Sequence, residues 1–259
     1  MADSSLAIHE PKPEQIDILG VPVTLTSLPE AVRMIAGWCE NRESRFVCTR
    51  DVHGIMLAQE DPRLLAIHRQ ADMVTPDGMP LVWVAKKRGF SAVSRVCGAD
   101  LVEALCDVSQ KPQLRHFFFG GKPGVAERMA AALAHRFPGL SIAGCETPPF
   151  RAMTDDEDEA TISKIAATHP HIVWVGLSTP KQEYWMAQHV GRIPGATLVG
   201  VGAAFDFMAG EVKRAPVWMQ RNGLEWLHRL LSEPRRLWRR YLVLAPMFLI
   251  RLAFSPKRR

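Results

Sequence analysis

Two polar residues follow successive apolar segments in the first third of the chain, and their types suit acid–base chemistry. Thr49 follows the apolar segment 46–48, and Asp77 stands between a proline and a glycine after segment 71–75. Proline and glycine around an acid predict a tight turn. In an open α/β sheet such turns lie at the carboxyl edge, where ligands bind. The sequence therefore makes Asp77 a candidate general base and Thr49 its candidate neighbour.

Asp77 also has a purely structural interpretation. A predicted helix begins near Met79, and Asp commonly caps the start of a helix. The residues alone leave both interpretations open.

Arg95 lies just before a predicted helix over residues 100–108. A lone arginine is usually a solvated surface charge. In a loop that leads into a helix start, its guanidinium could instead contact a phosphate. Arg95 is therefore a candidate phosphate ligand.

A glycine turn containing Gly120, Gly121 and Gly124 follows an apolar segment at 116–119. Such a turn lets backbone amides at a helix start approach a diphosphate. The turn is not GxGxxG, and no acid closes a following strand as a dinucleotide site requires. A plain strand-to-helix turn, with Pro123 in the first helical turn, explains the glycines nearly as well.

Polar residues also follow two further predicted strands, at 172–176 and 196–200. The helix start after the first strand is crowded with polar groups that could hold a sugar or a phosphate. An acid among small apolar residues follows the second strand. Such an acid needs a polar partner within the protein or a role in binding a ligand such as a sugar hydroxyl. The candidates at these two places are Lys181, Gln182, Glu183, Gly202 and Asp206.

The acidic segment 154–159 superficially matches the DxD pattern that holds a metal ion. Thr154 and Glu157 instead form a capping box, and acids in a first helical turn suit the helix dipole. The chain has no HExxH pattern, so we expect no metal site and no cofactor.

Strands that alternate with helices predict a mostly parallel α/β sheet with flanking helices. Ser27, Pro29 and Glu30 mark the start of a first helix over 28–41. The remaining expected elements are a hairpin at the sheet edge within 16–25, helical spacing over 52–70, a strand over 71–75, and strand–turn–helix units over 116–137 and 172–190.

Composition fits one large α/β domain of a cytoplasmic protein with an appendage. The chain has 259 residues, and 47% of them are hydrophobic. Its five cysteines form no CxxC pair, and its start lacks the pattern of a signal peptide. The net charge is +5, but residues 229–259 carry nine Lys or Arg against one acid. The basicity therefore belongs to the C-terminal segment.

The C-terminal segment 213–259 mixes arginines with Trp and Leu. Such segments lie in the interface of an anionic membrane, although a helix that packs on its own domain is the alternative. Its apolar part, 242–254, is too short to span a bilayer. No nucleic-acid motif accompanies the charge, so we expect no nucleic-acid partner.

Five sequence motifs occur together in one order: TPDGMPLVW, FFFGGKPG, VGLSTPKQE, GVGAAFDFMAGEVKRAP and GLEWLHRLLSEPRR. In this set the chain resembles the WecG/TagA/CpsF family of bacterial glycosyltransferases over residues 16–241. The resemblance implies a Rossmann-like fold and an inverting, metal-independent transfer. The donor would be a UDP-sugar, and the acceptor a polyprenyl-diphosphate-linked sugar at the inner membrane face. The implied division is a disordered tail at 1–15, a transferase domain at 16–212 and a membrane-associating appendage at 213–259.

The resemblance also implies roles for single residues. Asp77 would deprotonate the acceptor hydroxyl, and Thr49 would line the same pocket. Arg95 would stabilise the negative charge of the diphosphate. Gln182 and Asp206 would bind sugar or nucleotide. The appendage would close over the site and bring arginines to the leaving diphosphate, with Arg214, Arg229 and Arg236 as candidates.

One position departs from the family pattern. Asp51 stands where many members have Asn, and an extra acid there could alter sugar preference or the titration of Asp77. We carry Asp51 as a candidate donor contact. A homo-oligomer is compatible with the sequence.

Two other classes compete with the transferase interpretation. A nicotinamide-dependent sugar-nucleotide enzyme would share the α/β layout, but the chain lacks GxGxxG. A non-catalytic membrane scaffold would explain the appendage but not the polar residues repeated at strand ends.

Overall fold

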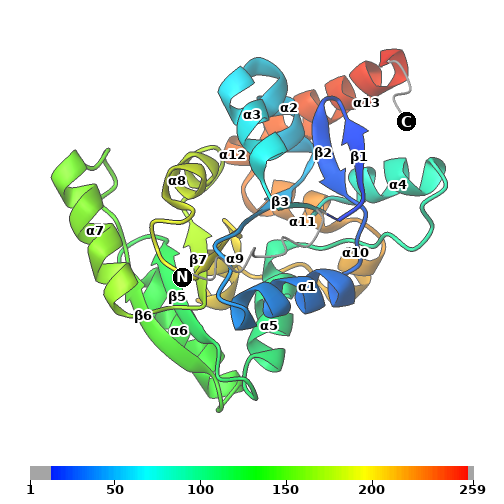
Figure 1. Ribbon diagram of the computed structural model, residues 1–259. Helices are drawn as coiled ribbons and strands as arrows, with labels where there is room; N and C mark the ends of the chain where they lie inside the picture. The colour runs from blue at the N-terminus through cyan, green and yellow to red at the C-terminus, as the bar shows by residue number, and fades with distance from the viewer. Residues whose placement is uncertain (1–12, 256–259) are drawn as a thin grey trace.

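Six parallel strands form the central sheet of the computed structural model, which describes residues 13–255 (Figure 1). Their order across the sheet is β4-β3-β8-β7-β5-β6, so all carboxyl ends meet at one edge. The strands are β3 Phe46–Arg50, β4 Met73–Pro76, β5 Arg115–Gly120, β6 Ser141–Glu146, β7 Ile172–Gly176 and β8 Thr197–Gly200. This confirms the predicted α/β class with a mostly parallel sheet.

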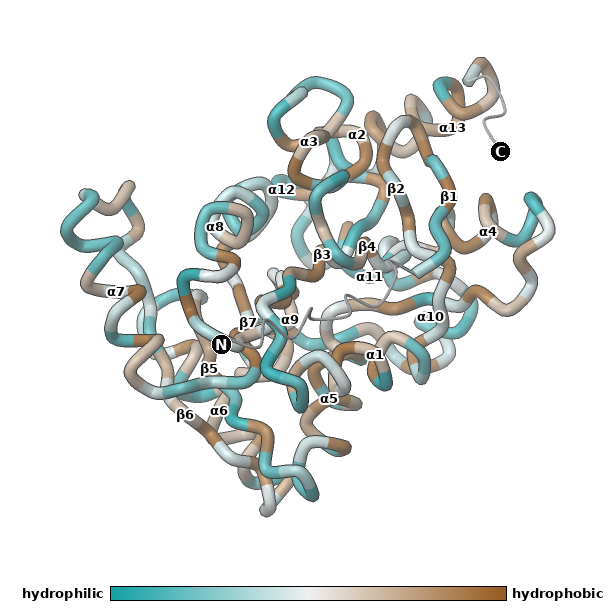
Figure 2. Tube along the Cα trace, in the orientation of Figure 1, coloured by the Kyte–Doolittle hydropathy of each residue, from teal (hydrophilic) through white to brown (hydrophobic). Residues whose placement is uncertain are grey.

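Helices cover both faces of the sheet because neighbouring strand residues point to opposite sides. Phe118 and Trp174 pack with α1 Leu28–Glu40, α5 Gly98–Val108, α6 Val125–Arg136 and α9 Ala204–Met208. Phe117 and Val173 face the cluster that contains α2 Val52–Glu60, α3 Pro62–Gln70, α4 Met79–Lys87, α7 Asp155–Ala167 and α8 Lys181–His189. In Figure 2 the hydrophobic colour runs through the central strands, whereas α3 and α7 carry much hydrophilic colour.

The predicted hairpin is present as a separate two-stranded sheet, β1 Gln15–Ile18 and β2 Val21–Thr24. It lies beside the edge strand β4, because the Val74 amide donates to Thr24 Oγ1 at 3.0 Å. Gln15, which was expected in the N-terminal tail, is the first residue of β1, and residues 1–12 lie outside the described residues.

Two sequence expectations about elements need correction. The helical spacing over 52–70 forms two helices, because Asp61 caps a new helix at Pro62 and accepts from the amides of the following turn. The edge strand β6 was not predicted. Its side chains are mostly half-buried, so the strand lacks the apolar run that marks the others.

The predicted helix start at Ser27 and the predicted capping box at Thr154 are confirmed, and both helices begin with a capping box. The Ser27 amide donates to Glu30 Oε2 at 2.9 Å at the start of α1. At the start of α7 the Thr154 amide donates to Glu157 Oε2 at 3.0 Å. The acidic segment 154–159 is therefore a helix start.

The C-terminal segment folds into a series of helices. They are α10 Val217–Arg221, α11 Glu225–Ser232, α12 Pro234–Trp238, the π-helix η1 Arg239–Leu244 and α13 Ala245–Phe254. Of these, η1 and α13 pack on α2. Phe248 is buried in the core, whereas Leu249 and Ile250 are 61% and 58% exposed. No helix within residues 13–255 is long and apolar enough to cross a membrane.

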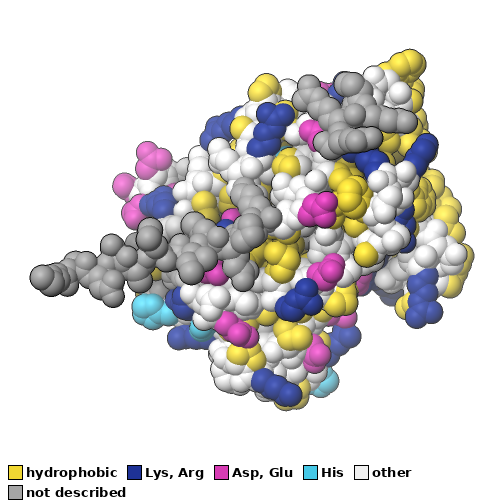
Figure 3. Space-filling view, turned by 45° about the vertical axis from the view of Figure 1, so that its right-hand side comes forward, with side chains coloured by type: hydrophobic (Ala, Val, Ile, Leu, Met, Phe, Trp, Pro, Cys, Tyr) yellow, Lys and Arg dark blue, Asp and Glu magenta, His cyan; other side chains and the backbone are white. Residues whose placement is uncertain are grey.

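Large exposed apolar side chains are concentrated on this C-terminal segment and on α4. Figure 3 turns that side of the molecule forward and shows hydrophobic side chains interspersed with Lys and Arg toward its right-hand edge. The exposed residues concerned are Trp83, Val217, Trp218, Trp226, Leu231, Trp238, Leu242, Val243, Leu249, Ile250 and Phe254.

Candidate active site

Asp77 and Asp51 lie side by side at the carboxyl edge of the sheet. Arg50 and Pro76 are paired in the register of β3 and β4, and each acid is the next residue along its chain. The Asp77 amide donates to the Arg50 carbonyl oxygen at 2.8 Å. A Cβ atom on Gly78 would lie 3.4 Å from the Asp51 Cβ, so the β4 turn packs closely on Asp51.

Asp77 does not cap the following helix, because the N-cap of α4 is Gly78 and no side chain completes that cap. Within residues 13–255 the Asp77 carboxylate has no hydrogen bond or ion pair. Burial raises the pKa of Asp77 to about 6, and the negative charge of Asp51 adds to this. Arg95 acts in the opposite direction. This environment suits a group that accepts a proton near neutral pH.

Asp51 has the opposite character. Its side chain caps α2 by accepting from the Gly54 amide at 3.1 Å, and it forms an ion pair with Arg240 of η1. Burial disfavours its charge, but Arg240 and His53 outweigh burial and hold the pKa of Asp51 well below its usual range. The Asp51 carboxylate thus already has two partners within the protein, the Gly54 amide and the Arg240 guanidinium.

Thr49 ties the ends of two neighbouring strands together. Its hydroxyl donates to the Gly200 carbonyl oxygen at 2.8 Å, and its side chain is buried. Thr49 thus lies at the predicted carboxyl edge of the sheet. It directly precedes Arg50, which is paired with Pro76.

Gln182 faces the end of β8 and is only 2% exposed. A Cβ atom on Gly200 would lie 3.0 Å from Gln182 Nε2, and one on Gly202 would lie 3.4 Å from Oε1. Among the described residues Oε1 has no hydrogen-bond partner although it is buried. Gln182 and Gly202 therefore lie together at the end of β8, as predicted.

Glu183 and Lys181 differ from the expectation that both crowd an open helix start. Glu183 is fully buried, and its Oε1 lies 2.5 Å from Arg50 Nη2. Arg50 also donates to Thr179 Oγ1 at 3.1 Å. Lys181 Nζ lies 5.6 Å from the centre of the Phe150 ring. The ion pair joins the end of β3 to α8, so Glu183 positions the edge from inside the protein.

The glycine turn after β5 is accounted for by packing of the backbone. A Cβ atom on Gly120, which has φ of 130°, would lie 2.6 Å from the Gly176 carbonyl oxygen. The Gly121 amide already donates to that oxygen at 3.0 Å. The N-cap of α6 is Gly124, so Pro123 precedes the helix and is not in its first turn. These contacts favour the strand-to-helix turn.

Asp206 lies in the first turn of α9, shortly after the end of β8, and is half-buried. No side-chain hydrogen bond or ion pair joins its carboxylate to the rest of residues 13–255. It remains a polar group at the predicted edge.

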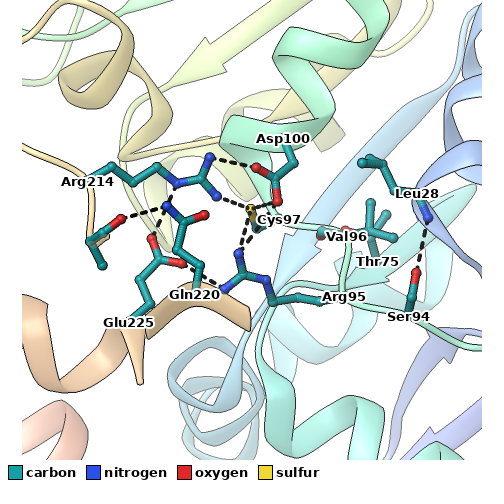
Figure 4. Close-up of polar contacts among 11 residues, drawn as sticks. Leu28, Thr75, Ser94, Arg95, Val96, Cys97, Asp100, Arg214, Gln220 and Glu225 are labelled. Atoms are coloured by element: carbon teal, nitrogen blue, oxygen red, sulfur yellow. Dashed lines mark hydrogen bonds and ion pairs between the residues drawn. The ribbon is translucent and has the colours of Figure 1, made fainter. Parts of the chain in front are cut away.

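Arg95 and Arg214 converge on two acids and a thiol between α5 and α11 (Figure 4). Arg95 Nη1 donates to Glu225 Oε2 at 2.7 Å, and Arg214 Nη1 lies 2.6 Å from Asp100 Oδ1. The Cys97 thiol donates to Asp100 Oδ2 at 3.0 Å and accepts from Arg214 at 3.2 Å. Burial raises the pKa of the Cys97 thiol, so it is protonated at neutral pH. The cluster fixes the C-terminal segment to the loop before α5.

Two further predicted arginines lie on the C-terminal segment. The Arg229 guanidinium lies 5.3 Å from the centre of the Phe207 ring, and its Nη2 lies 3.9 Å from Glu233 Oε1. Arg236 is 59% exposed and pairs with Glu233 at 2.7 Å. Arg236 is thus turned further toward solvent than Arg229.

Arg50, Arg240 and Glu225 were missed by sequence reasoning. Arg50 had a readable signal, since a charged residue at the end of an apolar strand needs a partner. Arg240 is one of several arginines in a basic segment, and nothing local distinguishes it from its neighbours.

A six-stranded parallel sheet flanked by helices, with polar side chains at its carboxyl edge, defines an α/β protein. The chain matches the Glycosyl transferase WecG/TagA/CpsF family over residues 16–259. It belongs to that family and is a glycosyltransferase, which favours the transferase interpretation over the nicotinamide enzyme and the scaffold.

A curated relative shares 35% identity over 205 residues, which cover 79% of this chain and 77% of the relative. It is the N-acetylglucosaminyldiphosphoundecaprenol N-acetyl-beta-D-mannosaminyltransferase of Bacillus spizizenii (strain ATCC 23059 / NRRL B-14472 / W23).

Proposed function

We propose that this protein transfers a sugar from a UDP-sugar to a hydroxyl group of a polyprenyl-diphosphate-linked sugar. The observation that carries the proposal is the Asp77 carboxylate, which has no side-chain partner within residues 13–255 and a pKa raised to about 6. The relative from Bacillus supports the acceptor class, because its name states that it acts on N-acetylglucosaminyldiphosphoundecaprenol.

The proposed reaction is a single displacement. Asp77 takes the proton of the acceptor hydroxyl while that oxygen attacks the anomeric carbon of the donor. The bond from the anomeric carbon to the diphosphate oxygen breaks at the same time, and UDP leaves with both electrons of that bond. Attack opposite the leaving group inverts the anomeric centre. A general base of this kind is typically worth about 10² to 10⁴ in rate.

The departing UDP needs cationic partners, and arginines are the proposed ones. Arg95 and Arg214 are close to the carboxyl edge of the sheet. In the structure Arg95 forms an ion pair with Glu225, and Arg214 forms one with Asp100. A diphosphate would replace one of these acids as the partner. Arg229 and Arg236 would approach from the C-terminal segment, and Gln182 and Asp206 would contact the sugar or the nucleotide. In this proposal no metal ion is required, and activity should persist in the presence of a chelator.

The exposed apolar face of α10 to α13 supports association with the inner membrane surface, where a polyprenyl-linked acceptor resides. Its Trp and Leu side chains are interspersed with arginines, which suits the interface of an anionic membrane. Phe248 of α13 is buried in the core, so the opposite face of that helix packs on the domain itself.

The decisive experiment is UDP release from a panel of UDP-sugars, measured with and without polyprenyl-diphosphate-linked acceptors in vesicles. We expect release with one donor to depend on the acceptor and to continue in EDTA. No acceptor-dependent release with any donor would overturn the proposed donor and acceptor classes, and loss of activity in EDTA would overturn metal independence alone.

A further inference from the structure

The ion pair between Asp51 and Arg240 joins the catalytic edge to the C-terminal segment. The two residues are 189 positions apart in the chain, and their side chains are 23% and 26% exposed. Asp51 is held in place independently, because it also caps α2 through Gly54. Arg240 therefore reaches toward a carboxylate whose position is already fixed by β3 and α2.

The segment around Arg240 is attached to the domain mainly by apolar contacts. Helices η1 and α13 pack on α2, and Phe248 enters the core. Arg240 is the residue of η1 that adds a charge to this interface, whereas Arg239 beside it is exposed. When η1 and α13 are packed on α2, the ion pair therefore places one positive charge at the carboxyl edge of the sheet.

That charge lies beside two neighbouring carboxyl groups. Asp51 and Asp77 follow paired residues of β3 and β4, and two adjacent carboxylates resist joint ionisation unless a cation compensates one of them. Asp51 has this compensation and Asp77 does not. The other charged or titratable groups that act on Asp77 are Arg50, Arg95, Cys97, Glu225 and Tyr241.

We propose that Arg240 is a positioning residue, which holds Asp51 ionised beside Asp77 so that only Asp77 exchanges a proton. Arg240 does so only while η1 and α13 are packed on α2. This inference rests on the proposed role of Asp77 as the base. It explains how an extra acid is accommodated at position 51 without competing for the proton. It also links the position of the membrane-facing helices to the ionisation of the edge.

The direct test is an NMR titration of aspartate carboxyl carbons in the full chain, with the Asp77 signal identified by its loss in Asp77→Asn. Arg240→Gln removes the cation that keeps Asp51 ionised, so the Asp51 signal, identified by its loss in Asp51→Asn, should titrate at a higher pH than in the wild type. The same variant removes a cation that lowers the pKa of Asp77, so the Asp77 midpoint should move up. Asp51→Asn removes an anion that raises it, so the midpoint should move down. Each shift of the Asp77 midpoint should be about 0.5 to 1 pH unit, and the double variant should fall between the single variants. Asn still caps α2, so Asp51→Asn keeps the helix start intact.

Hydrogen exchange of the amides in 239–254 tests the seating of the segment. Arg240→Gln and Asp51→Asn should each speed exchange by about threefold to tenfold, and the double variant by no more than the larger single effect. Arg235→Gln, which changes an exposed arginine of the same segment, is the matched control and should leave exchange and the Asp77 midpoint unchanged.

Midpoints that move in the same direction in the two single variants, or that do not move, would overturn the proposal. So would exchange rates equal to those of Arg235→Gln. Neither measurement uses turnover, so a failure of Asp77 as the base would be seen separately, as full activity of Asp77→Asn.

Discussion

Asp51 and Asp77 are the first residues after two paired strand ends, yet their surroundings drive their ionisation in opposite directions. Asp51 accepts from Gly54 and pairs with Arg240, which holds its pKa low. Asp77 is half-buried beside it without a side-chain partner in residues 13–255, and its pKa is raised to about 6. Two carboxyl groups with separated pKa values can divide a task, one as a fixed charge and one as a proton acceptor.

The first prediction concerns the proposed base. Asp77→Asn should lower acceptor-dependent UDP release by about 10² to 10⁴ because the amide cannot take the proton of the acceptor hydroxyl. The control is Asp156→Asn, at an exposed acid in the first turn of α7, which should retain wild-type activity. If Asp77→Asn releases UDP at the wild-type rate, Asp77 is only a turn residue.

The second prediction concerns the pH dependence of the reaction. Only the deprotonated form of Asp77 can accept a proton, and its pKa is raised to about 6. The rate at saturating substrate should therefore rise with pH through about 6 and level off above it. An acidic limb near pH 4, the ordinary range of a carboxyl group, would show that Asp77 does not control the rate.

The third prediction is that Asp77 lowers stability at neutral pH. Its pKa is raised from 3.8 to about 6 by folding, so the folded state loses stability relative to the unfolded state as pH rises through this window. Asp77→Asn should thus increase the free energy of unfolding at pH 7.5 by up to about 3 kcal/mol. The gain should disappear below pH 3.8, where both residues are neutral. Urea denaturation at the two pH values measures it, and an equal change at both would contradict the electrostatic cause.

The fourth prediction concerns the buried ion pair of Arg50 and Glu183. Arg50→Met leaves the fully buried Glu183 carboxylate without its partner and should reduce the free energy of unfolding by about 3 to 5 kcal/mol. The double variant Arg50→Met/Glu183→Met should lose much less than the two single losses combined.

A matched control for that measurement is the exposed pair of Arg192 and Glu159, with side chains 40% and 65% exposed. Arg192→Gln should change the free energy of unfolding by no more than about 1 kcal/mol. Similar losses at the buried and the exposed pair would show that burial does not determine the cost.

The fifth prediction tests the membrane-facing side of α13. Leu249→Glu and Ile250→Glu place charges on an exposed apolar face and should weaken binding to anionic vesicles at least about tenfold in a sedimentation assay. Phe150→Glu is the control, because Phe150 is 95% exposed but lies outside the C-terminal segment. Equal losses in all three variants, or none, would refute a specific membrane face.

Much of the fold could be predicted from the sequence because it depends on interactions between residues that are close in the chain. The capping boxes at Ser27 and Thr154 join residues three positions apart, and the apolar segments of the buried strands mark the sheet. Asp61 and Pro62 also carried a readable helix boundary, although the apolar spacing across them suggested one helix. β6 was not readable because a half-exposed edge strand needs no continuous apolar run.

The sequence by itself determined the α/β class, the polar residues at the strand ends and the basic, apolar character of the C-terminal segment. Only the tertiary structure decided which of those residues meet. Thr49 meets Gly200 across 151 positions, Arg50 meets Glu183 across 133, and Asp51 meets Arg240 across 189. No pattern of local spacing encodes such pairs, because they depend on the order of the strands in the sheet and on where the last helices dock. The opposite ionisation of Asp51 and Asp77 follows from those distant partners and from burial, which only the folded chain creates.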